Sequence, residues 1–190
     1  ERIRQNEQRF RGLREQEERA GKRRDQAQLD VREQERRIQL LEELERSLEG
    51  FSHSVKRILR ESSKGAFSGI HGPVSRLLTV PPEYAAAIEV ALGSAQQHLV
   101  VDTEADAQAA IRFLKQQDSG RATFLPLSTI RGSWLSESGL EQCPGFVGIA
   151  GQLCRYDERY QGVVRSLLGR VVVAEDLDRA VAMAKRYGHR

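Results

Sequence analysis

The sequence contains little cysteine and no long apolar run. It has only Cys143 and Cys154 among 190 residues, which is too few for a disulfide framework. So low a cysteine content is typical of proteins of the reducing cytosol. No run of about 18 apolar residues occurs, which excludes a membrane-spanning helix. The N-terminus is charged and lacks the apolar region of a signal peptide. We therefore expect a cytoplasmic protein.

Proline is absent from the first 50 residues, and all five prolines lie further on. The charges are divided as well. Residues 1–50 hold 13 basic and 13 acidic residues, whereas residues 51–190 hold 17 basic and 14 acidic residues and so carry the whole net charge of +3. Such a small excess does not by itself indicate a nucleic-acid-binding protein. Residues 1–50 are therefore expected to be solvent-exposed, whereas residues 51–190 can form a hydrophobic core.

Residues 1–49 carry an unbroken heptad pattern with one narrow apolar stripe. Nine of its 14 core positions are apolar and Arg, Glu and Gln fill the flanks, which is typical of a coiled-coil helix. At the usual rise this arm would be about 70 Å long. The stripe needs a partner helix, and a solvated single helix or a disordered charged arm is the alternative. Position a holds Ile3, Phe10, Glu17, Arg24, Val31, Ile38 and Glu45, and position d holds Asn6, Leu13, Ala20, Ala27, Gln34, Leu41 and Leu48.

Residues 50–190 are expected to alternate short helices and strands. The helices show the 3.6-residue apolar period, begin at proline or at a capping Asp or Thr, and end near glycine. The strands are short runs rich in apolar, β-branched residues. The stretch 64–73 is interpreted as turns. The expected elements are helices at 52–62 and 83–92, a strand at 98–101, a helix between Asp102 or Thr103 and Gly120, and strands at 122–125 and within 146–153.

A strand–helix unit occurs twice, about seventy residues apart. Its second copy is a strand at Val171–Val173 and a helix that ends at Gly188. The first copy continues into a strand, so we expect the domain to continue beyond residue 190 with a strand. Two related units favour an α/β-type, mixed α+β globule of two subdomains. The matching helix faces carry Ala107, Ala110, Ile111 and Leu114 in one copy and Leu177, Ala180, Val181 and Ala184 in the other.

No catalytic or cofactor site is recognisable. No segment fits G-x-x-x-x-G-K-[ST], so no ATP site can be assigned. The four histidines have no His or Cys neighbour at metal-ligand spacing. Ser54 adjoins His53 but lacks a G-x-S-x-G context. We predict no catalytic residue, no cofactor and no metal ligand in this chain.

Two groups of basic residues are the candidate nucleic-acid contacts. The first group falls within an arc of about 100° on the helix at 52–62, and such clustered cations release counterions from nucleic acid. An ordinary solvated helix face is the alternative. No aromatic side chains are interleaved, so any contact would be with the backbone and independent of base sequence. The first group is Lys56, Arg57, Arg60 and Lys64, and the second includes Lys185 and Arg186.

The strings A-I-E-x-A-L-G and G-R-A-T-F-L-P-L stand in a glycine-rich globule that a heptad arm enters. With GIHGPVSRLLTVPPEY before them, and GFVGIAGQL and GRVVVAEDLDRAVAMAKRYG after them, this order closely resembles the hinge domain of bacterial SMC (structural maintenance of chromosomes) proteins. The resemblance spans residues 50–190. The arm, residues 1–49, resembles the coiled coil that leads to the ATPase head.

The resemblance implies a function that composition did not show. Hinges of this family join two copies of a chromosome condensation and segregation ATPase, and hinge and coil are associated with DNA. ATP and Mg²⁺ would bind at heads outside this chain, where a kleisin-type subunit also binds, and the protein would be associated with the nucleoid. The partner of the arm would be the returning coil of the same protein. The family's hinge also continues past the point matching Arg190 into a glycine-rich segment that is important for dimerisation.

The dimer contact is assigned to the strand within 146–153. Glycines on an edge strand permit close approach of another chain, so Gly145, Gly148 and Gly151 are the candidates. An internal strand with glycine bends is the alternative.

Two other classes of function are also considered. One is a purely architectural dimerisation module that does not bind DNA. The other is an enzyme with a small-molecule site at the strand ends, for which the sequence offers no recognisable set of titratable groups.

Overall fold

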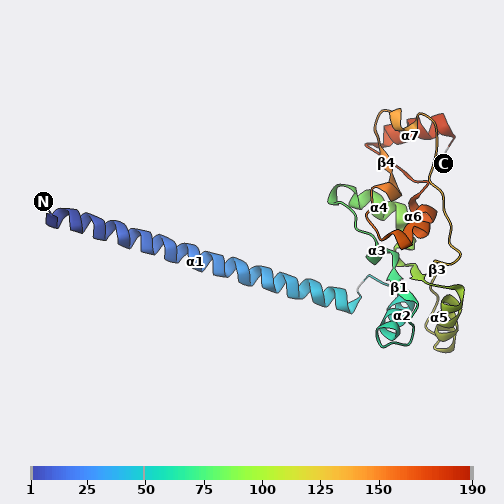
Figure 1. Cartoon of the computed structure of the whole chain (residues 1–190), viewed down its shortest axis with the longest axis horizontal. Coiled ribbons are helices and arrows are strands. Elements are labelled where there is room, and N and C mark those ends of the chain that lie inside the picture. Colours follow the sequence, from blue (N-terminus) through green and yellow to red (C-terminus); the bar gives the residue numbers. More distant parts are fainter. Residues whose placement is uncertain (1, 49, 189–190) are drawn as a thin grey trace. The chain divides into compact units, whose positions relative to one another are not determined.

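The computed structural model describes residues 2–48 and 50–188. Residues 1–50 and residues 51–190 are two separate compact units (Figure 1). Within the described ranges, no helix has both the length and the apolar character needed to cross a bilayer.

The first unit is a single helix, α1 (Arg2–Ser47), as the heptad pattern predicts. The lack of proline and the many Arg, Glu and Gln residues favour an uninterrupted helix. Five large apolar side chains of the stripe are between 55% and 75% exposed, namely Ile3, Leu13, Val31, Ile38 and Leu41. Other stripe positions, such as Phe10 and Glu45, lie outside the described side chains. These five exposed side chains form an apolar stripe on the arm.

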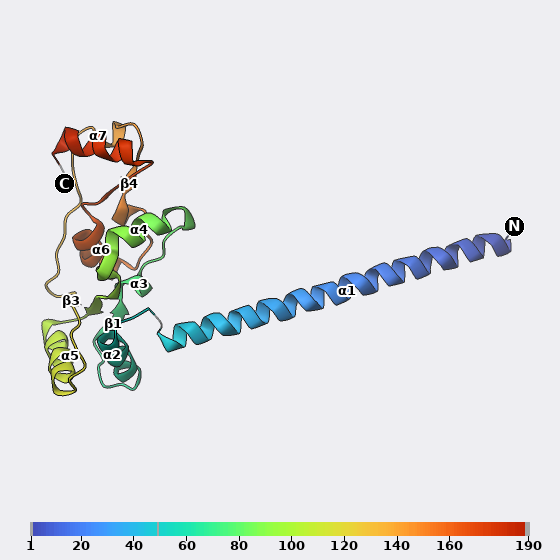
Figure 2. The same cartoon turned by 180° about the vertical axis from the view of Figure 1, so that it is seen from behind.

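The second unit consists of two lobes, each built on one sheet, and the first lobe spans residues 51–126. Figures 1 and 2 show its elements α2, β1, β3 and α5 close together. Its sheet has the order β1-β2-β3, with β1 antiparallel and β3 parallel to the fully buried central strand β2. The elements are α2 (His53–Ser63), β1 (Ile70–Pro73), α3 (Val74–Leu77), η1 (Pro82–Tyr84), α4 (Ala85–Leu92), η2 (Gly93–Gln97), β2 (Leu99–Val101), α5 (Glu104–Gln116) and β3 (Phe124–Pro126).

The second lobe spans residues 140–188, and residues 127–139 connect it to the first lobe. Its sheet is an antiparallel pair of strands, β4 and β5. The elements are η3 (Leu140–Gln142), β4 (Phe146–Ile149), η4 (Ala150–Gln152), η5 (Glu158–Tyr160), α6 (Gln161–Leu168), β5 (Val172–Ala174) and α7 (Leu177–Tyr187).

The two lobes are internal repeats. Shifting β1, η1 and α4 by 76 positions gives the bounds of β4, η5 and α6. Each antiparallel pair has an irregularity at the same place, before Gly72 in one lobe and before Gly148 in the other. The two related subdomains that the sequence predicts are therefore present. The repeat begins at β1 and β4, earlier in the chain than the strand–helix unit from which the sequence predicted it.

One apolar core joins the two lobes. It contains Val74, Ile88 and Val100 from the first lobe, packed with Tyr160 and Leu168 from the second. A smaller core lies between α2, α5 and β2, and another lies under α7. The lobes thus share buried surface, which fixes them as one globule.

Three local expectations differ from the structure. The stretch 64–73 is not only turns, because it contains strand β1. Helix α5 ends at Gln116 and not beside Gly120, which takes a φ of 82° in the following turn. On α7 the buried side chain is Met183, whereas Leu177 is 77% exposed. The apolar face of α7 is therefore only partly covered.

Candidate interaction surfaces

Helix α2 directs its basic arc outward because its opposite side is apolar. Val55 and Ile58 are buried, and they pack with Ala110 and Leu114 of α5. The helix also lies against the segment after α5, since the hydroxyl of Ser54 donates a hydrogen bond to the Arg121 carbonyl at 2.6 Å. This packing fixes the orientation of the first basic group relative to the first lobe.

The four cations of this group differ in how far they are engaged. Lys64 forms an ion pair with Glu61 at 2.9 Å. The Arg57 guanidinium donates to the Gln117 side chain at 3.3 Å and lies 5.8 Å from the Phe113 ring centroid. Of the group, the least engaged are Lys56 and Arg60, whose side chains make no hydrogen bond or ion pair with any residue that the structure describes.

The second basic group lies on α7, at the far end of the globule from α2 (Figures 1 and 2). Lys185 is exposed, and the guanidinium of Arg186 lies 5.4 Å from the Tyr187 ring centroid and 3.7 Å from the Cys143 sulfur. The structure therefore separates the two groups, and they do not form one continuous surface.

The three candidate dimer-contact glycines all face neighbours within this chain. A Cβ on Gly145 would lie 2.5 Å from Arg179, and one on Gly148 would lie 3.0 Å from Leu153. A Cβ on Gly151 would lie 2.8 Å from the Trp134 ring. These contacts account for the absence of side chains, so the dimer contact at these glycines stays a prediction.

The edge of β5 opposite β4 is open. Among the described residues β5 pairs only with β4, whereas its counterpart β2 has β3 on the equivalent edge. Beside it lies an apolar groove of about 260 Å³, lined by residues that include Leu140, Val172, Ala174 and Met183. An open edge next to an apolar groove is suited to receive another extended segment.

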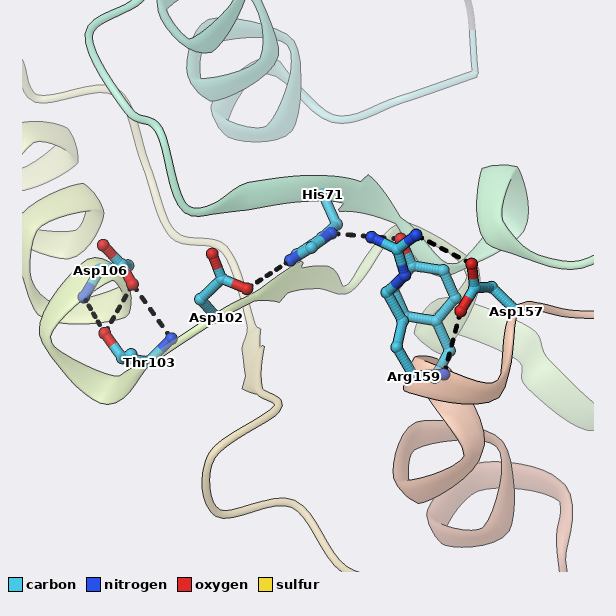
Figure 3. A network of polar contacts seen from close by, with 7 residues as sticks. His71, Asp102, Thr103, Asp106, Asp157 and Arg159 are labelled. Atoms are coloured by element: carbon cyan, nitrogen blue, oxygen red, sulfur yellow. Dashed lines mark hydrogen bonds and ion pairs between the residues drawn. The ribbon is translucent and has the colours of Figure 1, made fainter.

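A polar network between the lobes was not predicted from the sequence (Figure 3). His71 of β1 is hydrogen-bonded to Asp102 through Nε2 at 2.7 Å and to the Tyr160 hydroxyl through Nδ1 at 3.1 Å. Tyr160 begins α6 in the other lobe. No local pattern pairs His71 with these residues, because Asp102 and Tyr160 lie 31 and 89 positions away along the chain.

Charges next to this network cap η5, the 3-10 helix that leads into α6. Asp157 accepts hydrogen bonds from the Arg159 guanidinium at 2.8 Å and from the Arg159 backbone N–H at 3.1 Å. These contacts hold the pKa of Asp157 at about 2, below its ordinary value of 3.8, and they raise the pKa of Arg159. The guanidinium of Arg159 also lies 5.4 Å from the Tyr160 ring centroid.

Thr103 and Asp106 form the capping box that starts α5, also drawn in Figure 3. Of the two caps that the sequence allowed, Thr103 is the one used, and Asp102 is free to contact His71. Gly69 lies against this box, since a Cβ there would meet the Asp106 carboxylate at 2.6 Å. Across the parts of the chain that the structure describes, no group of three or more His, Cys, Asp or Glu residues could hold a metal ion.

These observations define a two-lobed mixed α/β domain in a chain that also contains a long helix. The family model described as "SMC proteins Flexible Hinge Domain" matches residues 67–184. The chain therefore belongs to the SMC hinge family, as the resemblance in the sequence indicated.

Individual relatives agree with this assignment. The chain is 42% identical over 154 residues to the Chromosome partition protein Smc of Bacillus subtilis, covering 80% of this chain and 13% of that protein. The dimeric SMC hinge domain of Geobacillus stearothermophilus matches with a TM-score of 0.79 and 41% identity, covering 87% of this chain and 66% of that one. The Pyrococcus furiosus SMC hinge domain matches with a TM-score of 0.58 and 32% identity, covering 73% of this chain and 70% of that one. The chain thus spans about an eighth of the length of the curated relatives it matches.

Proposed function

We propose that this chain is the dimerisation hinge of a chromosome condensation and segregation protein and that it does no chemistry itself. Membership of the hinge family supports this proposal, together with the dimer formed by the similar Geobacillus domain. In the whole protein, ATP and Mg²⁺ would act at heads outside this chain, where a kleisin-type subunit would bind. The protein would work on the nucleoid in the cytoplasm.

The arm is proposed to pair with a returning coil of the same protein. The observation in favour is the exposed stripe of α1, where Val31, Ile38 and Leu41 are each more than half exposed. Apolar side chains at heptad spacing are stabilised when a second helix covers them. Replacing Val31 by Asp should therefore weaken arm pairing in the full-length protein, as measured by cysteine cross-linking along the coil. An unchanged cross-linking yield would contradict it.

The hinge itself is proposed to be completed by a segment beyond residue 190. In the first repeat, β3 covers the edge of β2, and the connection that follows it crosses α6, where Gly132 lies against Ser166. The repeat makes the edge of β5 equivalent to the edge of β2, and the outer face of α4 equivalent to that of α6. Among the described residues both of these surfaces are open, and Val90 on α4 is 83% exposed. One continuous segment, a parallel strand followed by an extended connection, would fill both.

This completion can be tested with a single cysteine. A Val90→Cys variant should react readily with a thiol reagent in the 190-residue chain, because that position is exposed. It should become protected in a protein extended through the following segment. Equal reactivity in both proteins would contradict the completed hinge.

For DNA, the proposed contact is the basic arc of α2, where Arg60 is exposed and Lys56 is partly exposed. The observation that carries it is that Lys56 and Arg60 lack the ion pair that occupies Lys64, so their charges are available to phosphates. Such binding ignores base sequence and falls steeply with salt, because each neutralised phosphate releases counterions.

The experiment compares two charge-matched double variants. Lys56→Gln with Arg60→Gln should weaken binding to a random duplex roughly tenfold or more at low salt and make its salt dependence shallower. The control, Arg170→Gln with Lys185→Gln, removes two cations at the far end of the globule and should change binding little. If only the control variant weakens binding, the contact lies on α7 and not on α2.

The alternative function is an architectural module that dimerises without binding DNA. The observation that favours it is the partial engagement of the first group by Glu61, Gln117 and Phe113. A complete hinge that shows no binding at low salt while remaining dimeric would establish this alternative.

A further inference from the structure

The two lobes are joined on one side by a short chain of polar side chains. Asp102 follows β2 and His71 lies on β1 (Figure 3). Tyr160 is the N-cap residue of α6 in the second lobe. The distances are 2.7 Å from His71 Nε2 to Asp102 Oδ1 and 3.1 Å from His71 Nδ1 to the Tyr160 oxygen. We refer to these three residues as the inter-lobe contact.

The roles of donor and acceptor in the inter-lobe contact follow from chemistry. An ionised Asp102 carboxylate can only accept, so the Nε2–H of His71 donates to it. In an imidazole with one proton, Nδ1 is then an acceptor, and the Tyr160 hydroxyl donates to it. Both ring nitrogens are thus satisfied by partners from different lobes. The two aromatic rings also meet edge to face, with centroids 5.6 Å apart.

Both ends of the inter-lobe contact are held firmly. Tyr160 is only 9% exposed and belongs to the core shared by the lobes. The backbone N–H of Asp102 donates to Gly69 at 2.8 Å, and Thr103 beside it caps α5. His71 itself is half-buried, with 17% of its side chain exposed. Relative movement of the lobes on this side therefore breaks the hydrogen bond between His71 and Tyr160.

The inter-lobe contact occurs only once, although the fold is repeated. The repeat places Val147 at the position equivalent to His71, and Tyr84 at the position equivalent to Tyr160. Valine has no hydrogen-bonding side-chain atom, so the other side of the repeat cannot form the same bonds. The polar connection is a property of one side and not a consequence of the repeat.

We propose that His71 is a positioning residue that fixes the orientation of the two lobes of the hinge. Elsewhere the described residues of the two lobes meet through non-directional apolar contacts, through the backbone bridge between Thr79 and Arg155, and through the charge attraction between Arg159 and Asp102. Apolar contacts tolerate small rotations, whereas two hydrogen bonds on one imidazole do not. Loss of the inter-lobe contact leaves the lobes folded and lets them separate more often. The proposal concerns one chain and is independent of dimerisation and of DNA.

Hydrogen exchange at the bridge measures lobe separation directly. The N–H of Thr79 donates to the Arg155 carbonyl, and the N–H of Arg155 donates to the Thr79 carbonyl, both at 2.8 Å. These two amides exchange only when the lobes part at the bridge. In the 190-residue chain, Tyr160→Phe removes one hydroxyl from the inter-lobe contact and preserves the ring. It should speed exchange at both amides about five- to tenfold, since one such hydrogen bond contributes about 1 kcal/mol.

Further variants separate a specific contact from general destabilisation. His71→Val should speed exchange at Thr79 and Arg155 at least as much, and adding Tyr160→Phe to it should have little further effect. The matched control is Tyr84→Phe, which removes a hydroxyl at the equivalent position of the other repeat and should leave the bridge amides unchanged. Amides inside α5 report opening within a lobe and should keep their exchange rates in Tyr160→Phe.

Three results would overturn the proposal. The first is unchanged exchange at Thr79 and Arg155 in Tyr160→Phe. The second is an equal effect of Tyr84→Phe. The third is an equal acceleration throughout α5 in Tyr160→Phe, which would show that the hydroxyl stabilises the whole fold and not the orientation of the lobes.

Discussion

Thr79 and Arg155 pair with each other across an isolated antiparallel bridge, and they occupy equivalent positions in the two repeats. Each donates its backbone N–H to the other's carbonyl at 2.8 Å. Such reciprocal pairing between equivalent residues relates the two lobes by an approximate two-fold axis near this bridge. The hinge globule is therefore a pseudo-symmetric pair of lobes built from one chain.

The capping box of α5 provides the first stability prediction. Thr103→Ala removes the acceptor for the Asp106 N–H and should lower the free energy of unfolding by about 1 kcal/mol, as urea denaturation would measure. Thr129→Ala is the control, because its hydroxyl forms no hydrogen bond with any described residue. Equal losses in the two variants would show that the box does not stabilise the helix.

Gly132 is expected to tolerate no side chain. A Cβ there would overlap the Ser166 backbone N, and backbone cannot move aside without disturbing α6. Gly132→Ala should destabilise the globule by about 3 kcal/mol or more in thermal unfolding. By contrast, Gly21→Ala places a methyl group in open space on α1 and should raise helicity, since alanine is favoured by about 1 kcal/mol in a helix. A wild-type melting temperature for Gly132→Ala would contradict the close packing.

His98 should make the stability depend on pH. Its burial lowers its pKa below the ordinary value of 6.5, because the charged imidazole is poorly solvated in the fold. Its contribution is therefore fully present above pH 6.5 and is lost as the pH falls through the lowered pKa. Compared with His98→Gln, the wild-type protein should lose more stability between about pH 7.5 and about pH 5. Parallel pH profiles would disprove this assignment.

The cysteines should be unreactive in the folded protein. Cys143 and Cys154 are each 7% exposed, and burial also raises the pKa of Cys154, which leaves less of the reactive thiolate. A colourimetric thiol reagent should titrate both residues in denaturant and neither within minutes under native conditions. Rapid reaction of a thiol in the native protein would show that the second lobe opens readily.

Much of this architecture can be predicted from local sequence. The heptad stripe predicts α1, Pro82 and Gly93 bound the helical segment that contains α4, and the Thr103 cap starts α5. Strand β1 was missed because Gly69, Gly72 and Pro73 suggest turns. Glycine at position 69 is required by the Asp106 carboxylate of α5, which is distant in sequence.

The candidate site was only partly predictable, for a related reason. The spacing of Lys56 and Arg60 on a helix predicts that they share a face, since that depends on local geometry alone. That Phe113 and Gln117 hold Arg57 depends on the packing of α2 against α5, which no local pattern reports.

The sequence by itself determined the long arm, the helices and strands of both repeats except β1, α3 and α6, and the membership of the hinge family, because periodicity, caps and glycine stops act over a few residues. Only the tertiary structure decided which cations remain unpaired, that the two basic groups lie at opposite ends, and that His71 joins the lobes. These properties depend on side chains brought together from distant positions, whose partners are set by packing and not by spacing along the chain.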